Sequence, residues 1–295
     1  MSQATDAPAT PAFEAALEAQ QRRRGFLMAL PSLAYLTIFF ALPLVIVVVY
    51  SFATRNRFGG TDLSGWNLDS YEALGGELVR AVLFRSLGLA VLTTVLCLLI
   101  AYPFAYHLAT RRPAVRNVML VFVMIPFWTN FLVRNYAWYV ILGSDGPLSK
   151  ITEFLGFGPQ RVLFTQAAVV LGLVYGFLPF MVLPLYAAIE RVDGRLLEAG
   201  RDLYASGFAT FRHILLPLSM PGVIAGSILV FIPSLGAYVT PEILGGAKTT
   251  LLGSYIVTQF LTARNFPFGA ALSTVLMLLM LLAAAFYFRR EGRTL

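Results

Sequence analysis

The sequence is poor in the residues that build catalytic and metal sites. Its 295 residues include one cysteine and two histidines, and only 13% of them are charged. The single cysteine, Cys97, excludes an internal disulfide and a site with two thiolate ligands, and we expect it to be a small buried side chain. His107 and His213 lack the spacing of a helical metal-binding pair. We find no nucleophile elbow and no paired carboxylates in the apolar segments. We therefore predict no metal site and no cofactor, and we do not expect an enzyme.

Apolar residues, by contrast, are in large excess. They make up 58% of the chain, against about 45–50% in soluble domains. A helix that crosses a bilayer needs about 20 apolar residues, because unpaired backbone groups in lipid cost several kcal/mol each. Six runs reach this length, so we predict an all-α polytopic membrane protein with six transmembrane helices. The predicted spans are 26–54, about 86–110, 117–142, 163–189, 216–240 and 266–288.

These spans leave too little chain for a separate globular domain. We predict an N-terminal tail at 1–25, an extracytoplasmic loop at 55–81, a helical core at 82–288 and a C-terminal tail at 289–295. Three arginines precede the first span, as in a secretory signal. That apolar run is much longer than the apolar core of a signal peptide, which has about 7–15 residues, so we predict a membrane anchor that stays attached.

The basic residues indicate the orientation of the chain. Lys and Arg accumulate in short cytoplasmic loops, and with the N-terminus inside, thirteen of the 22 fall inside, eight fall outside and Arg134 stays within the third span. This predicts that both termini are cytoplasmic, and it explains the positive charge by the lipid bilayer rather than by nucleic acid. The apolar stretch 249–263 is too short to cross, so we predict a half-buried or re-entrant outer helix; a full span there would move the C-terminal arginines outside.

The inner loop 191–217 is long, charged and patterned. Asp193 can cap a helix by accepting backbone hydrogen bonds, and Ser206 and Gly207 should interrupt that helix. A second short helix follows and should stop or kink near Pro217. From periodicity alone, an amphipathic loop lying on lipid headgroups is an equal alternative. The residues at helical spacing are Leu196, Ala199, Gly200, Leu203 and Tyr204.

The amino-acid sequence of this loop resembles a known motif. Residues 198–204 read Glu-Ala-Gly-Arg-Asp-Leu-Tyr, and nine residues later 214–217 read Ile-Leu-Leu-Pro. This resembles the EAA motif of type I ABC-importer permeases, in which Glu-Ala-Ala, three residues and Gly are followed nine residues later by Ile-x-Leu-Pro. Gly200 and Tyr204 depart from that pattern. The resemblance implies a coupling helix that docks on an ATPase, with these candidate residues: Glu198, Ala199, Gly200, Arg201, Asp202, Leu203, Tyr204, Ile214, Leu216 and Pro217.

Two further segments extend the resemblance. Residues 125–130, Ile-Pro-Phe-Trp-Thr-Asn, and 236–242, Gly-Ala-Tyr-Val-Thr-Pro-Glu, look like spermidine/putrescine permeases, although relatives that import opines, amino acids or other organic ions look similar. The resemblance implies an ABC transmembrane type-1 core at 82–288 in a bacterial inner membrane. It also implies two ATP-binding cassette ATPase subunits, a second permease or another copy of this chain, and an extracytoplasmic solute-binding protein.

Candidate solute contacts follow from the chemistry of polyamines, which carboxylates and aromatic faces can bind. The candidates are Trp128, Asn130, Arg134, Tyr136, Tyr238 and Glu242. Aromatic residues at span ends are also typical of an interface belt, and Arg134 could equally extend to the outer surface from the end of its span. An ion-coupled secondary transporter is the main rival class, but it would need intramembrane acids or an inverted repeat, and we detect neither.

Overall fold

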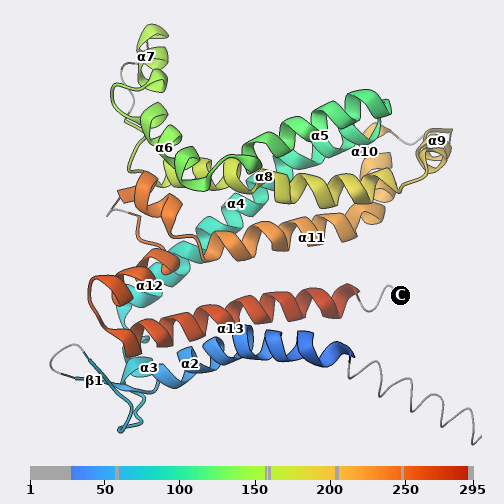
Figure 1. Ribbon diagram of the computed structural model, residues 1–295. Coiled ribbons are helices and arrows are strands. Elements are labelled where there is room, and N and C mark those ends of the chain that lie inside the picture. Colours follow the sequence, from blue (N-terminus) through green and yellow to red (C-terminus); the bar gives the residue numbers. More distant parts are fainter. Residues whose placement is uncertain are drawn as a thin grey trace, which may run out of the picture.

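The structure, a computed structural model, is a bundle of helices (Figure 1). It describes residues 28–56, 60–156, 158, 161–202, 206–246 and 249–291, with side chains for all of these except Arg201 and 286–291. The predicted N-terminal tail lies outside the described residues. The elements are η1 Thr37–Ala41, α2 Leu42–Tyr50, β1 Thr54–Arg55, β2 Thr61–Asp62, α3 Asp69–Ala73, α4 Glu77–Ala109, α5 Pro113–Trp128, α6 Phe131–Leu142, α7 Pro147–Phe154, α8 Gln166–Glu190, α9 Gly194–Asp202, α10 Gly207–Thr210, η2 Phe211–Leu215, α11 Leu216–Leu235, η3 Pro241–Gly245, α12 Leu252–Leu261 and α13 Phe266–Glu291.

Among the residues that the structure describes, five helices are long and apolar enough to cross a membrane. They are Met28–Tyr50, Glu77–Ala109, Gln166–Glu190, Gly207–Leu235 and Phe266–Ala285. The all-α membrane fold is thus confirmed. The C-terminal helix α13 continues to Glu291, so the predicted C-terminal tail begins inside a helix. The second helix of the predicted inner loop is likewise continuous with a span, because α10, η2 and α11 follow one another without a break.

The segment 117–142, predicted to be one span, is not a single continuous helix in the structure. It is divided into α5 and the helix Phe131–Phe154, which meet at an angle of 91°. The break falls at Thr129 and Asn130, whose ψ angles of 148° and 133° are extended rather than helical. Asn130 then caps α6, since its side chain accepts hydrogen bonds from the backbone N–H groups of Leu132 and Val133.

The predicted outer helix at 249–263 is present as α12. It has 10 residues, too few to cross a bilayer. Ser86 of α4 accepts a hydrogen bond from the backbone N–H of Leu252 at 2.7 Å, so the start of α12 is anchored on α4. Gly253 allows α12 to approach the end of α11, because a Cβ there would lie 2.4 Å from the carbonyl oxygen of Gly236.

The core lies where α8 packs between α4 and α11 (Figure 1). Cys97 is fully buried there, as predicted, with Met181 and Leu185 of α8. Gly222 and Gly226, one turn apart on α11, bring that helix close to α8, and small residues at this spacing are typical of tightly packed membrane helices.

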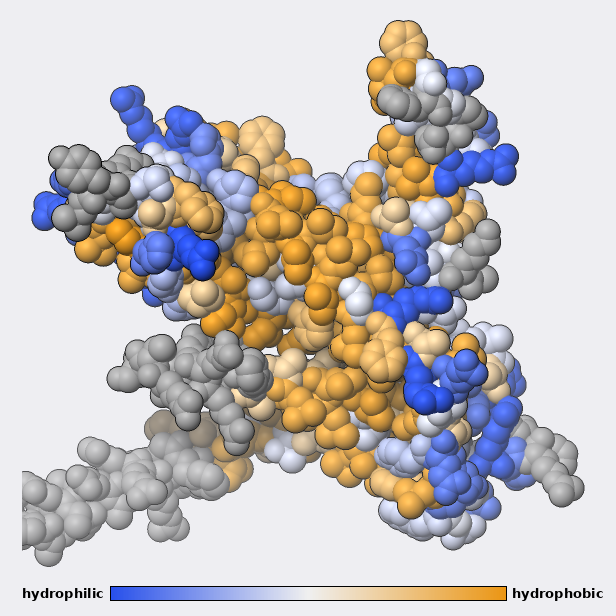
Figure 2. Space-filling model, turned by 180° about the vertical axis from the view of Figure 1, so that it is seen from behind, coloured by the Kyte–Doolittle hydropathy of each residue, from blue (hydrophilic) through white to orange (hydrophobic). Residues whose placement is uncertain are grey.

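The helix pair α2 and α13 lies beside this core (Figure 1). The apolar 18-residue window of the helix Met28–Tyr50 has no buried residue. Seen from behind, apolar side chains cover the middle of the molecule and polar ones gather toward the ends (Figure 2). The helix α9 lies at one end of the bundle, and the hairpin β1–β2, α3 and α12 lie at the other (Figure 1).

Candidate coupling site

The helix α9 carries the first half of the predicted coupling motif and projects from one end of the bundle. The side chain of Asp193 accepts a hydrogen bond from the backbone N–H of Arg195 at 3.0 Å, which caps the helix as predicted. Glu198, Ala199 and Asp202 are exposed, and so is Leu196 with 48% of its surface. The outer side of α9 therefore offers two carboxylates together with apolar surface.

The inner side of α9 packs against the start of the next span. Gly200 is buried, and a Cβ there would lie 2.6 Å from Cδ1 of Ile214 and 3.7 Å from Thr210. Leu197 packs on the core cluster of α4 and α8. Gly200, where the family motif usually has alanine, therefore permits a close approach to Ile214, the first residue of the second half of the motif.

The segment against which α9 packs, α10 and η2, has an irregular helical geometry. Ser206 caps α10 by accepting a hydrogen bond from the backbone N–H of Ala209 at 3.2 Å. The next residues form the π-helical turn η2, in which the backbone N–H of Leu216 reaches Phe211. Pro217 has no N–H group to continue an α-helical ladder, which is consistent with a wider turn at this point. The predicted kink near Pro217 is thus a π-helical turn within a continuous helix.

Tyr102 of α4 joins this segment to the rest of the core. Its hydroxyl shares a hydrogen bond of 2.7 Å with the hydroxyl of Ser219, and its ring meets Phe211 edge-on at a centroid distance of 5.2 Å. Ser219 is fully buried. A displacement of η2 would therefore also move the residues of α4 and α11 that contact it.

An ion pair stands where α8 ends and the loop to α9 begins. Arg116 of α5 pairs with Glu190, the last residue of α8, and its guanidinium lies 5.9 Å from the ring centroid of Tyr186. This contact ties α5 to the helix that leads into α9.

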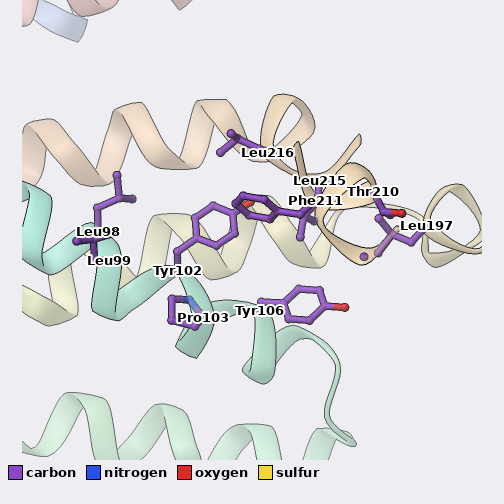
Figure 3. Close-up of a pocket in the computed structure, with 11 residues that line it drawn as sticks. Leu98, Leu99, Tyr102, Pro103, Tyr106, Leu197, Thr210, Phe211, Leu215 and Leu216 are labelled. Carbon is purple, nitrogen blue, oxygen red and sulfur yellow. The ribbon is translucent and has the colours of Figure 1, made fainter. Parts of the chain in front are cut away.

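A cavity of about 580 Å³ lies between α4, α9 and the η2–α11 junction (Figure 3). Among the described residues its lining is almost entirely apolar and contains no charged side chain. The residues that line it are Leu98, Leu99, Tyr102, Pro103, Tyr106, Leu197, Gly207, Thr210, Phe211, Leu215 and Leu216.

The comparison with known proteins identifies the family. Residues 98–290 match the family described as binding-protein-dependent transport system inner membrane component. The chain belongs to this family. It is therefore a permease subunit of an ABC transporter in the inner membrane, where it works with an ATPase and a solute-binding protein rather than as a catalyst.

Several relatives are similar over most of their length. The spermidine/putrescine transport system permease protein PotB of Haemophilus influenzae is 43% identical over 87% of this chain and 90% of the relative. PotB of Escherichia coli is 42% identical over 89% and 96%. The inner membrane ABC transporter permease protein YdcU of Escherichia coli is 30% identical over 88% of each chain.

Solved structures share the fold at much lower identity. A chain of a bacterial alginate ABC transporter, solved with its alginate-bound periplasmic protein, has a TM-score of 0.75, 14% identity and coverage of 94% of this chain and 96% of the other. A chain of the MetNI methionine transporter has a TM-score of 0.53 with 20% identity over 75% of this chain and 99% of the other.

The permease contains most of the predicted coupling residues in one cluster. Ile214 of η2 and Leu216 of α11 are half-buried, and Pro217, the second residue of α11, is exposed. Leu203, Tyr204 and the side chain of Arg201 lie outside the described residues. Sequence reasoning missed Tyr102, Phe211 and Ser219, because a contact between residues 117 positions apart leaves no local pattern.

Two of the predicted solute contacts hold the break between α5 and α6 together. Asn130 caps α6, as described above. Arg134 donates a hydrogen bond of 2.9 Å to the carbonyl oxygen of Pro126, and its guanidinium lies over the rings of Phe131 and Tyr175 at 5.3 and 5.8 Å. This carbonyl belongs to the last turn of α5, which has no helical partner for it.

The other four candidates are exposed at separate places. Trp128, at the end of α5, is 80% exposed, and Tyr136 of α6 is 59% exposed. Tyr238 lines a groove between α2, α11, α12 and α13, and none of the other five candidates lines it. Glu242 is exposed in the first turn of η3. Within the described part of this subunit, the groove at Tyr238 contains one of the six candidates, and the break between α5 and α6 contains two others.

Proposed function

We propose that this permease forms part of the pathway through which spermidine or putrescine enters the cell. The observation that carries the proposal is the 42–43% identity with PotB proteins, which extends over almost the whole of both chains. The exposed acid Glu242 and the exposed rings of Trp128, Tyr136 and Tyr238 supply groups that bind alkylammonium ions. In this proposal Asn130 and Arg134 fix the α5–α6 break and do not touch the solute.

The helix α9 is the element that docks on the ATPase. Its outer side has the exposed acids Glu198 and Asp202, whose charges would fix the position of the helix on the ATPase. Leu196 and Ala199 supply apolar contact. Its inner side reaches Ile214 through Gly200. Movement of the ATPase would pass through η2 into α11 and, through Tyr102, into α4. Leu203, Tyr204 and Arg201 complete the motif by resemblance alone.

The orientation follows from the same assignment. An ATPase is cytoplasmic, so the end of the bundle with α9 faces the cytoplasm. The start of the helix Met28–Tyr50 and the end of α13 lie at the same end (Figure 1), and in this proposal both termini are cytoplasmic. Exposed arginines at that end, Arg111, Arg112 and Arg212 among them, agree with the positive-inside rule. The predicted loop 55–81 is then extracytoplasmic.

A second permease, or another copy of this chain, completes the pathway. The helix Met28–Tyr50 is apolar along its length with no buried residue in its apolar window, and the groove beside it at Tyr238 is open. A pathway between two subunits would explain why the described solute candidates lie at separate places on this one.

Uptake in a defined strain tests the substrate. Cells without their own polyamine importers would express the permease with its companion subunits, and accumulation of labelled spermidine would be measured with unlabelled putrescine or an opine as competitor. We expect uptake that depends on ATP and is reduced by putrescine. If collapse of the ion gradient at constant ATP stopped uptake, or if only the opine competed, the proposal would be wrong.

The variant Glu198→Lys tests the docking role. Reversing an exposed charge on α9 should abolish transport and leave the amount of protein in the membrane unchanged, because surface substitutions seldom change stability by more than about 0.5 kcal/mol. The matched control is Glu72→Lys in α3, an exposed acid at the other end of the bundle. Normal uptake by Glu198→Lys would refute the role assigned to α9.

A further inference from the structure

The cavity beside α9 has a chemical character that transport does not explain. It lies along α4 from Leu98 to Tyr106, a length of about 12 Å for eight residues of helix. Leu99 is 64% exposed and Pro103 is also exposed, so the cavity opens sideways from the helix bundle. The described residues that line it include no carboxylate, so this apolar lining does not suit a polyammonium solute.

We infer that this cavity binds an acyl chain of an anionic phospholipid from the leaflet on the α9 side. The cavity lies beside the second half of α4, a helix that is long and apolar enough to span a membrane. This position puts it at the depth of the lipid hydrocarbon. Each acyl-chain methylene buried in the cavity adds to the free energy of lipid binding, as each buried methylene of a lipid anchor does. An apolar cavity that opens to hydrocarbon at this depth is filled by the lipid chains around it.

The charges at the end of the cavity favour an anionic headgroup. Arg111 and Arg112 are exposed just beyond the end of α4, and Arg212 is exposed directly after Phe211, which lines the cavity from η2. Arg111 is held toward α4 by a hydrogen bond of 3.1 Å to His107. A phosphate at this end of the cavity would lie near arginines from two segments of the chain, and each arginine near an anionic lipid surface strengthens binding by about fivefold.

The hydroxyl of Tyr106 marks the boundary between chain and headgroup. It points away from Leu98 and Leu99, toward the end of the cavity that Leu197 lines (Figure 3). Within the described residues it has no hydrogen-bond partner. A tyrosine with an apolar body and a polar tip is typical of the level at which lipid carbonyls and phosphates lie.

Bound lipid would touch both halves of the coupling site. Leu197 of α9 and Phe211 of η2 line the cavity together with Leu98 of α4. An acyl chain between them would fill the space that separates α9 from α4. This consequence for coupling rests on the docking role proposed above, whereas the binding of the lipid does not.

Photolabelling of the intact complex tests the inference. The permease and its partner subunits would be reconstituted in nanodiscs of phosphatidylglycerol and phosphatidylcholine, with a trace of phosphatidylglycerol that carries a diazirine near the end of one acyl chain. Labelled peptides would then be mapped by mass spectrometry. We expect labels on residues 98–106 and 211–216, with about fivefold less preference for phosphatidylglycerol in Arg212→Gln.

Two glycines provide a matched pair of variants. Gly207 lines the cavity and Gly194 does not, yet each begins a helix of the loop, and a Cβ added to either would meet no atom within 4 Å. Gly207→Phe should reduce the labelling about tenfold, because its ring would displace about two methylenes of the acyl chain. Gly194→Phe should leave the labelling unchanged.

Equal labelling in the two glycine variants would overturn the inference. So would cross-links from the cavity to a segment of a second permease, which would make that protein the occupant. Labelling that shows no preference between the two headgroups would refute the role of the arginines and leave no case for an anionic lipid. Since the label reports lipid and not solute, these outcomes are independent of whether polyamines are transported.

Discussion

The close contact of α8 and α11 through Gly222 leads to a quantitative prediction. A Cβ on Gly222 would lie 2.5 Å from Cβ of Ala188, 2.6 Å from the carbonyl oxygen of Pro184 and 3.2 Å from Cα of Leu185. Two of these atoms belong to the backbone, so rotation of a side chain cannot relieve the overlap. Overpacking of this kind costs about 1–3 kcal/mol, whereas replacing glycine by alanine within a helix gains about 0.5–1 kcal/mol. We expect Gly222→Ala to lower the free energy of unfolding by about 1–2 kcal/mol.

Gly88 provides the control for this substitution. It also lies within a predicted span, on α4, but a Cβ there would meet no atom within 4 Å. Gly88→Ala should therefore raise the free energy of unfolding by about 0.5–1 kcal/mol. The addition of Ala188→Gly to Gly222→Ala should restore only part of the loss, because the carbonyl of Pro184 stays in place. The assay is unfolding by SDS in lipid–detergent bicelles. Equal effects of Gly222→Ala and Gly88→Ala would refute the contact.

Two further predictions concern polar contacts. Arg134→Leu should lower the free energy of unfolding by about 1–2 kcal/mol in the same assay. The loss stays small because the hydroxyl of Thr129 still donates a hydrogen bond of 2.7 Å to the carbonyl of Pro126. A loss above about 4 kcal/mol would show that Arg134 does more than stabilise the break between α5 and α6. Tyr102→Phe should cost only about 0.5–1.5 kcal/mol, since it removes the hydrogen bond to Ser219 and keeps the ring contact with Phe211. Tyr102→Ala should cost about 3–5 kcal/mol, and equal losses for the two Tyr102 variants would show that the ring contact contributes nothing.

The sequence was most informative where a pattern is local. The apolar runs predicted the spans because a bilayer requires a minimum length of apolar helix, and Asp193 predicted the start of α9 because a helix needs a cap for its first N–H groups. The motif that begins at Glu198 indicated the family correctly. Each of these signals lies within a few dozen consecutive residues.

What could not be predicted depends on contacts between distant segments. The break between α5 and α6 is stabilised by Arg134 folding back on Pro126, and the sequence left open whether that arginine extends to the surface or faces the pathway. Gly200 departs from the family motif, and only the structure shows that this residue lies against Ile214, where a Cβ would be 2.6 Å from Cδ1. The solute candidates were chosen by residue type, and residue type does not determine which faces of different helices come together.

The docking of α9 on an ATPase is tested most directly by cross-linking. Cys97 is buried, so an added cysteine at the exposed Ala199 would be the reactive one, and Ala73→Cys in α3 is an exposed control at the other end of the bundle. With a short thiol-to-amine cross-linker in membranes that contain the whole complex, we expect Ala199→Cys to yield an adduct with the ATPase subunit and Ala73→Cys to yield none. An Ala199→Cys variant that reacts with lipid or solvent reagents, but never with the ATPase, would contradict the account.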